Sequence, residues 1–109
     1  MPGKVVHCKK ESYDVYIGRG RGSVWGNPFR IGANADGDRD EVIEKYTEWI
    51  VRGEGRPLLR RLGELEGKTL GCWCAGHGGL TADDELICHG QILLKLLEHR
   101  REKIAQRDR

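Results

Sequence analysis

The chain has 109 residues, of which 38% are hydrophobic and 33% are charged, and its formal net charge is +2. This length predicts a single domain, with its core over residues 4–99 and a charged helix end or tail over residues 100–109. No run of about 20 apolar residues and no apolar signal-peptide core are present, so we expect a cytoplasmic protein with no membrane contact, and the small net charge does not favour tight nonspecific binding of nucleic acid.

Two short strands are predicted near the N-terminus, in KVVHC (residues 4–8) and DVYI (residues 14–17), because β-branched and aromatic residues are concentrated there. The following segment, residues 18–38, contains too many glycines and turn-forming residues for a regular helix or strand. Trp25, Phe29 and Ile31 lie within it, and these apolar side chains favour an ordered loop that folds onto the core.

The first predicted helix begins after Asp38, a candidate N-cap that has Glu41 three residues later, as in a capping box. Apolar residues then recur at helical spacing until Gly53, which is expected to end the helix. Leucines repeat behind Pro57, so a second and shorter helix is predicted over residues 57–65.

A buried strand is predicted over residues 68–73, and a third helix begins at His89. The last helix has one apolar stripe, made of Ile92, Leu93, Leu96 and Leu97, and becomes mostly charged beyond His99. This order of elements predicts a small α/β domain, a Rossmann-like layered fold with a short central sheet and three helices.

Three of the four cysteines lie in the segment GCWCAGHGGLTADDELICHG, residues 71–90. Side chains alternate along a strand, so Cys72 and Cys74 would point to the same side of the sheet, while Cys88 and His89 stand where the last helix begins. Three thiolates and one imidazole are a suitable ligand set for a tetrahedral zinc ion. We therefore expect zinc to be bound by Cys72, Cys74, Cys88 and His89.

Other interpretations of the cysteine segment stay open, because its spacing is not that of a standard zinc finger. His77, His7 or Cys8 can replace one of the expected ligands. Alternatively, Cys88 near a helix N-terminus can be a reactive thiol, with His89 or His77 as its base. The cysteines can also be small buried side chains with no chemical role.

The glycine-rich segment that follows the second strand has the composition of an anion site. Glycines allow backbone N–H groups to approach an anion closely, and arginines can bind phosphate with two hydrogen bonds. An indole in such a loop can stack on a base or anchor the loop in the core. The predicted phosphate- or ligand-binding residues are Gly18, Arg19, Arg21, Trp25, Asn27 and Arg39.

The motifs YIGRG, WGNPF, RDEV, CWC and CHG follow one another in that order. Over Val5–Leu97 the chain resembles an uncharacterised family of bacteriophages and bacteria, domain of unknown function 4326. The resemblance implies a shared site at the CWC and CHG motifs, which favours the metal, and a location in the bacterial or host cytoplasm. Between these two motifs the chain departs from the family pattern, because its link is longer and has no proline.

We expect a zinc-binding domain that recognises a phosphate-bearing ligand, a nucleotide or a nucleic acid, in phage or bacterial nucleotide or DNA metabolism. The ligand site should form where the loop Gly18–Phe29 and the segment Cys72–His89 meet at one end of the sheet. One alternative is an enzyme that cleaves or transfers at the glycosidic bond of a nucleoside or nucleotide, using Asp83, Asp84 or Glu85. Another is a phage protein-interaction module with an exposed apolar patch and no small ligand.

Overall fold

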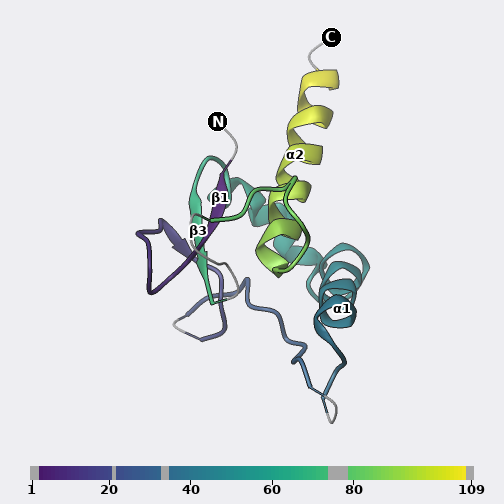
Figure 1. The fold of residues 1–109 in the computed structure, drawn as a ribbon. Coiled ribbons are helices and arrows are strands. Elements are labelled where there is room, and N and C mark those ends of the chain that lie inside the picture. The colour runs from purple at the N-terminus through teal and green to yellow at the C-terminus, as the bar shows by residue number, and fades with distance from the viewer. Residues whose placement is uncertain (1–2, 21, 33–34, 74–78, 108–109) are drawn as a thin grey trace.

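The computed structural model describes residues 3–20, 22–32, 35–73 and 79–107. Within these ranges three helical segments accompany a three-stranded parallel sheet, which confirms the predicted small α/β fold class (Figure 1). The elements in chain order are β1 (Lys4–His7), β2 (Val15–Tyr16), α1 (Arg39–Arg52), the 3₁₀ helix η1 (Arg56–Leu65), β3 (Thr69–Cys72) and α2 (His89–Arg107).

The sheet is built around β3, which lies between β1 and β2 and pairs with both in parallel. In this register Cys72 stands opposite His7, and Gly71 stands opposite Tyr16. Since parallel strands point the same way, all three strands end at one edge of the sheet. The chain leaves this edge through loops, where side chains with chemical roles can gather.

The core lies between the sheet and the helices, and every element except β2 contributes fully buried side chains to it. α2 contacts β1, α1 and η1, so it is covered on more than one side. For this reason Leu94 is buried together with the predicted stripe, whereas Leu96 is only partly buried. The largest fully buried side chains include Tyr46, Ile17, Ile50, Leu65, Leu70, Leu93 and Leu97.

The predicted start and end of α1 are confirmed. The Asp38 carboxylate accepts the Glu41 N–H at 2.9 Å, and the Glu41 carboxylate accepts the Asp38 N–H at 3.1 Å. Gly53 forms the C-cap. The second predicted helix is a 3₁₀ helix, in which Leu62 and Leu65 are buried, and their spacing of three residues suits a helix with three residues per turn.

α2 begins very close to the sheet because Gly90 has no side chain. A Cβ atom at this position would lie 2.6 Å from Ile17 Cδ1 and 2.8 Å from Val5 Cγ2. At its other end α2 runs away from the sheet (Figure 1), and Arg101 forms a salt bridge with Glu66 at 2.9 Å. In the described part of the chain, no helix is both long and apolar enough to cross a membrane.

Tyr46 joins α1 to the glycine-rich loop from inside the core. Its side chain is 0% exposed, and its hydroxyl donates a hydrogen bond to the Trp25 carbonyl oxygen at 2.8 Å. Burial, and to a lesser degree the nearby sulfur of Cys88, raises the pKa of Tyr46 well above its usual range. The folded protein therefore holds this phenol in its protonated form.

Replacing Tyr46 with Phe should lower the free energy of unfolding by about 1 kcal/mol at neutral pH, through loss of the hydrogen bond. The contribution of Tyr46 is fully present below the pKa of an unfolded tyrosine, about 10, and is lost as the pH rises above it. Urea unfolding between pH 8 and 11 should show the gap between wild type and variant closing above pH 10. A gap that stays constant would contradict this account, and Tyr13→Phe on the surface is the control.

Candidate functional site

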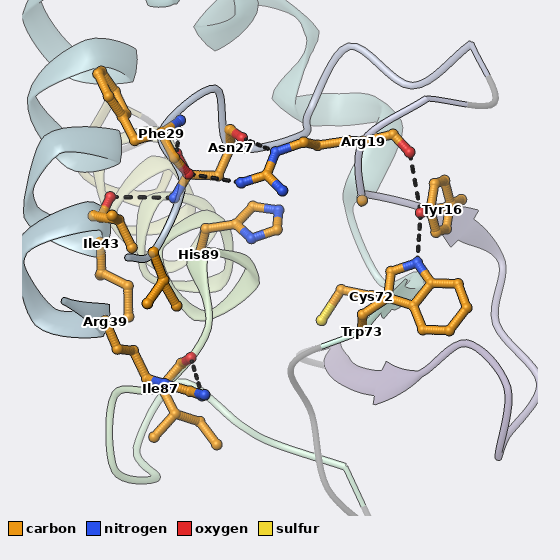
Figure 2. Close-up of a pocket in the computed structure, with 13 residues that line it drawn as sticks. Tyr16, Arg19, Asn27, Phe29, Arg39, Ile43, Cys72, Trp73, Ile87 and His89 are labelled. Carbon is orange, nitrogen blue, oxygen red and sulfur yellow. Dashed lines mark hydrogen bonds between the residues drawn. The ribbon is translucent and has the colours of Figure 1, made fainter. Parts of the chain in front are cut away.

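A pocket of about 280 Å³ opens at the edge of the sheet where the strands end. Its walls come from the ends of β2 and β3, from the glycine-rich loop and from the first turns of α1 and α2. Figure 2 shows Arg19 and His89 near the middle, with Arg39 and Trp73 on opposite sides of the view. The loop and the cysteine segment thus meet at one end of the sheet, where α/β folds place their ligand crevices.

The charged side chains in the described lining of this pocket are of one sign. The lining contains the guanidinium groups of Arg19 and Arg39 and no Asp or Glu. α2 also begins at the pocket, and a helix N-terminus carries a partial positive charge, whereas the N-terminus of α1 is capped by the Asp38 carboxylate. The arrangement therefore favours an anionic group inside the pocket.

Arg19 holds the glycine-rich loop together. Its Nε donates to the Asn27 carbonyl oxygen and one Nη to the Phe29 carbonyl oxygen, both at 2.7 Å. These two bonds tie the YIGRG motif to the WGNPF motif. Arg19 therefore has a structural task in addition to the charge that it places on the pocket wall.

The WGNPF motif is fixed by Asn27, which is 7% exposed. Its amide nitrogen donates to the Val42 carbonyl oxygen of α1 at 3.1 Å, and its amide oxygen accepts the Phe29 N–H at 2.9 Å. Gly26 allows the motif to lie against the preceding segment, since a Cβ there would be 2.8 Å from the Gly18 carbonyl oxygen. Asn27 thus lines the pocket and also fixes the shape of its wall.

The remaining predicted ligand residues fall in different places. Gly18 lines the pocket, and Arg39 lines it while donating through Nη1 to the Ile87 carbonyl oxygen at 3.1 Å. Trp25 is 2% exposed and packs in the core, so in this structure its indole anchors the loop. Arg21 lies outside the described residues.

Cys72, Cys88 and His89 are close together, as the sequence predicts. The two sulfur atoms are 3.0 Å apart, and Cys88 Sγ lies 3.9 Å from His89 Nδ1. His89 Nε2 is 2.8 Å from the Ile17 carbonyl oxygen, and because a carbonyl only accepts, Nε2 carries the hydrogen. Nδ1 is the ring nitrogen that faces Cys88.

This geometry can be compared with that of a metal centre. Two thiolates on one tetrahedral zinc ion lie about 3.8 Å apart, since each Zn–S bond is about 2.3 Å long. Cys72 and Cys88 would have to separate by about 0.8 Å to share the ion, and in the described residues no group of three His, Cys, Asp or Glu side chains is placed to hold a metal. Cys74 and His77, a predicted ligand and its alternative, lie outside the described residues.

The two alternative ligands on β1 have other contacts. The ring of His7 packs edge-on against Trp73, and its Nδ1 accepts the Lys9 N–H at 3.1 Å. Cys8 is partly buried just after β1 and donates its backbone N–H to the Cys72 carbonyl oxygen at 2.9 Å.

The acidic residues proposed for an enzyme lie elsewhere. The Asp84 carboxylate accepts the Thr81 N–H at 2.7 Å and so closes a turn. Asp83 lines a separate hollow beside Lys4, at the opposite end of β1 from the pocket. Glu85 is exposed.

Gln91 positions the cysteine segment, and the sequence reasoning missed it. Its side chain is 0% exposed and makes five hydrogen bonds. The amide oxygen accepts the N–H groups of Ile87 and Cys88, and the amide nitrogen donates to three carbonyl oxygens of residues 81–85. The available signal was a glutamine three residues after Cys88 at the helix start, the spacing of a capping box.

The comparison with known proteins places the chain in a family. The profile of the family described as Domain of unknown function (DUF4326) matches residues 4–99, so the chain belongs to this family. It is also similar to Uncharacterized protein R718 of Acanthamoeba polyphaga mimivirus, at 35% identity over 94 residues that cover 79% of this chain and 68% of the viral protein. No solved structure matches the chain.

Replacing Gln91 with Leu should leave buried carbonyl and N–H groups unpaired and lower the free energy of unfolding by about 2–4 kcal/mol. Urea unfolding measures the loss, and hydrogen exchange at the amides of Ile87 and Cys88 should become faster. Lys95→Leu, an exposed change on the same helix, is the control and should have little effect. If Gln91→Leu unfolded at the same urea concentration as the wild-type protein, the five hydrogen bonds would not be what holds the segment.

Proposed function

We propose that the protein binds a small ligand through a phosphate group, in the pocket at the carboxyl edge of the sheet. The observation that carries this proposal is the concentration of positive charge there. Two guanidinium groups and the N-terminus of α2 face a pocket whose described lining has no carboxylate. Phosphate is the biological anion that best matches such donors.

The size of the pocket limits the ligand. Pockets for small molecules have volumes of roughly 300–1,000 Å³, and this one, at about 280 Å³, is near the lower limit. It suits a single sugar phosphate or one nucleotide better than a length of nucleic acid. We therefore propose a binding role in nucleotide or DNA metabolism, which would supply a phosphate-bearing ligand of this size.

The enzyme alternative receives less support from the described geometry. General acid–base chemistry at a glycosidic bond needs a carboxylate within hydrogen-bonding reach of the ligand. Asp83, Asp84 and Glu85 are not among the residues that line the pocket. We therefore propose binding rather than turnover for the described site.

Arg39 provides the sharpest test of phosphate binding. Arg39→Gln keeps a neutral hydrogen-bond donor but removes the charge, so the affinity for ribose 5-phosphate should fall about 10-fold in isothermal titration. Arg52→Gln, at the other end of the same helix, should bind as wild type does. Unphosphorylated ribose should bind to neither variant.

Equal losses in Arg39→Gln and Arg52→Gln would show a general charge effect and no specific site. Equal affinities of the wild-type protein for ribose and ribose 5-phosphate would contradict the proposal directly.

A structural zinc ion is a second proposal, for the cysteine segment. The observation in its favour is the convergence of Cys72, Cys88 and His89, with Nδ1 of the imidazole on the side of the Cys88 sulfur. Cys74 would supply the fourth ligand, and four protein ligands would leave no position for a catalytic water. Such an ion would tie the end of β3 to the start of α2.

The zinc proposal predicts about one zinc ion per chain in protein purified without chelators or a metal-affinity tag. Chelator should then lower the melting temperature, because metal binding contributes to folding. Cys88→Ser should lose the metal, while Cys8→Ser should keep it. A metal-free protein whose melting temperature is unchanged in chelator would contradict the proposal.

A further inference from the structure

Trp73 combines a large exposed aromatic surface with a place on the pocket wall. Trp73 is the residue directly after β3, and it lines the pocket and is 49% exposed. The other two indoles are placed differently, since Trp25 is buried in the core and Trp49 lies on α1 against Tyr46. Neither of them lines this pocket.

The orientation of the Trp73 ring is fixed by its neighbours. Its Nε1 donates to the Tyr16 hydroxyl at 2.8 Å, and that hydroxyl donates to the Arg19 carbonyl oxygen at 3.2 Å (Figure 2). His7, at the end of β1, packs its ring edge-on against the indole, with 5.5 Å between the two ring centres. Lys9 Nζ lies 5.7 Å from the centre of the Trp73 ring. A large exposed side chain is thus held in one position before any ligand arrives, so little conformational entropy is lost on binding.

The pocket therefore has two chemically different parts. Arg39, Arg19 and the start of α2 offer positive charge, whereas Trp73, with Phe29 and Ile31, offers aromatic and apolar surface. Ile31 is 54% exposed, which also places apolar surface at the mouth of the pocket. A ligand that uses both parts carries a phosphate at one end and a flat aromatic group at the other.

We propose that Trp73 is a stacking platform for a nucleobase, so that the ligand of this pocket is a nucleotide and its base determines affinity. This inference rests on the proposed phosphate site and adds the second point of recognition. Stacking of a base on an aromatic side chain is worth enough to change affinity roughly 10- to 100-fold. Stacking tolerates different bases because each has a flat face, so purines and pyrimidines should both bind.

The test compares two ligands that differ only in the base. Isothermal titration with adenosine 5′-monophosphate and with ribose 5-phosphate should show wild-type protein preferring the nucleotide by at least about 10-fold. Trp73→Ala should bind the two ligands equally, with its affinity for ribose 5-phosphate unchanged. Trp73→Phe, which retains a ring, should keep most of the preference. If Trp73→Ala does not fold, Trp73→Leu, which keeps apolar bulk without a ring, takes its place and should also bind the two ligands equally.

Trp49→Phe is the matched control, because it removes an indole from outside the pocket and should retain the full preference. Equal wild-type affinities for the two ligands would overturn the stacking inference and leave phosphate binding in place. A preference that survives in Trp73→Ala would overturn it as well. Failure of wild type to bind either ligand would overturn both proposals.

A further titration with a short single strand that carries a 5′-phosphate distinguishes the source of the nucleotide. Weaker binding of the strand than of the monophosphate supports a free nucleotide. If the strand and the monophosphate bind equally well and both need Trp73, the indole stacks on the terminal base of a strand in the same way.

Discussion

The site depends on the parallel pairing of β3 with both of its neighbours. Because β1 and β2 run in the same direction as β3, the chain must leave all three strands at one edge and return through helices or loops. His7, Tyr16 and Cys72 consequently end their strands at the same edge, and α1 and α2 begin close to it. The pocket is a direct product of this topology.

Polar side chains then hold the irregular segments in place. The exposed Arg19 and the buried Asn27 satisfy carbonyl and N–H groups of the glycine-rich loop, and the buried Gln91 does the same for the segment before α2. A buried polar group without a partner costs about 1–3 kcal/mol, so these bonds specify one conformation where regular pairing is absent. They explain how a small protein with many glycines keeps a defined pocket wall.

The predictable parts of the structure are those set by local pattern. Helical spacing and the Asp38 capping box predicted α1, the motif order predicted the family, and the expected α/β fold predicted that two distant segments meet at one end of the sheet. Local patterns do not report which side chains are buried by the fold, so the role of Gln91 was missed. Local patterns also could not show which tryptophan is buried and which lines the pocket, because only tertiary packing places Trp25 in the core and Trp73 on the pocket wall.

The most direct measurement is a nuclear magnetic resonance titration of ¹⁵N-labelled protein with adenosine 5′-monophosphate. The account predicts that the shifted signals are the backbone amides at the starts of α1 and α2 and the indole N–H of Trp73. The signals of backbone amides beside the hollow lined by Trp49 and Arg52, at the opposite end of α1, should not shift. Shifts confined to that hollow, or no shifts at all, would contradict the claim that the carboxyl edge of the sheet binds a nucleotide.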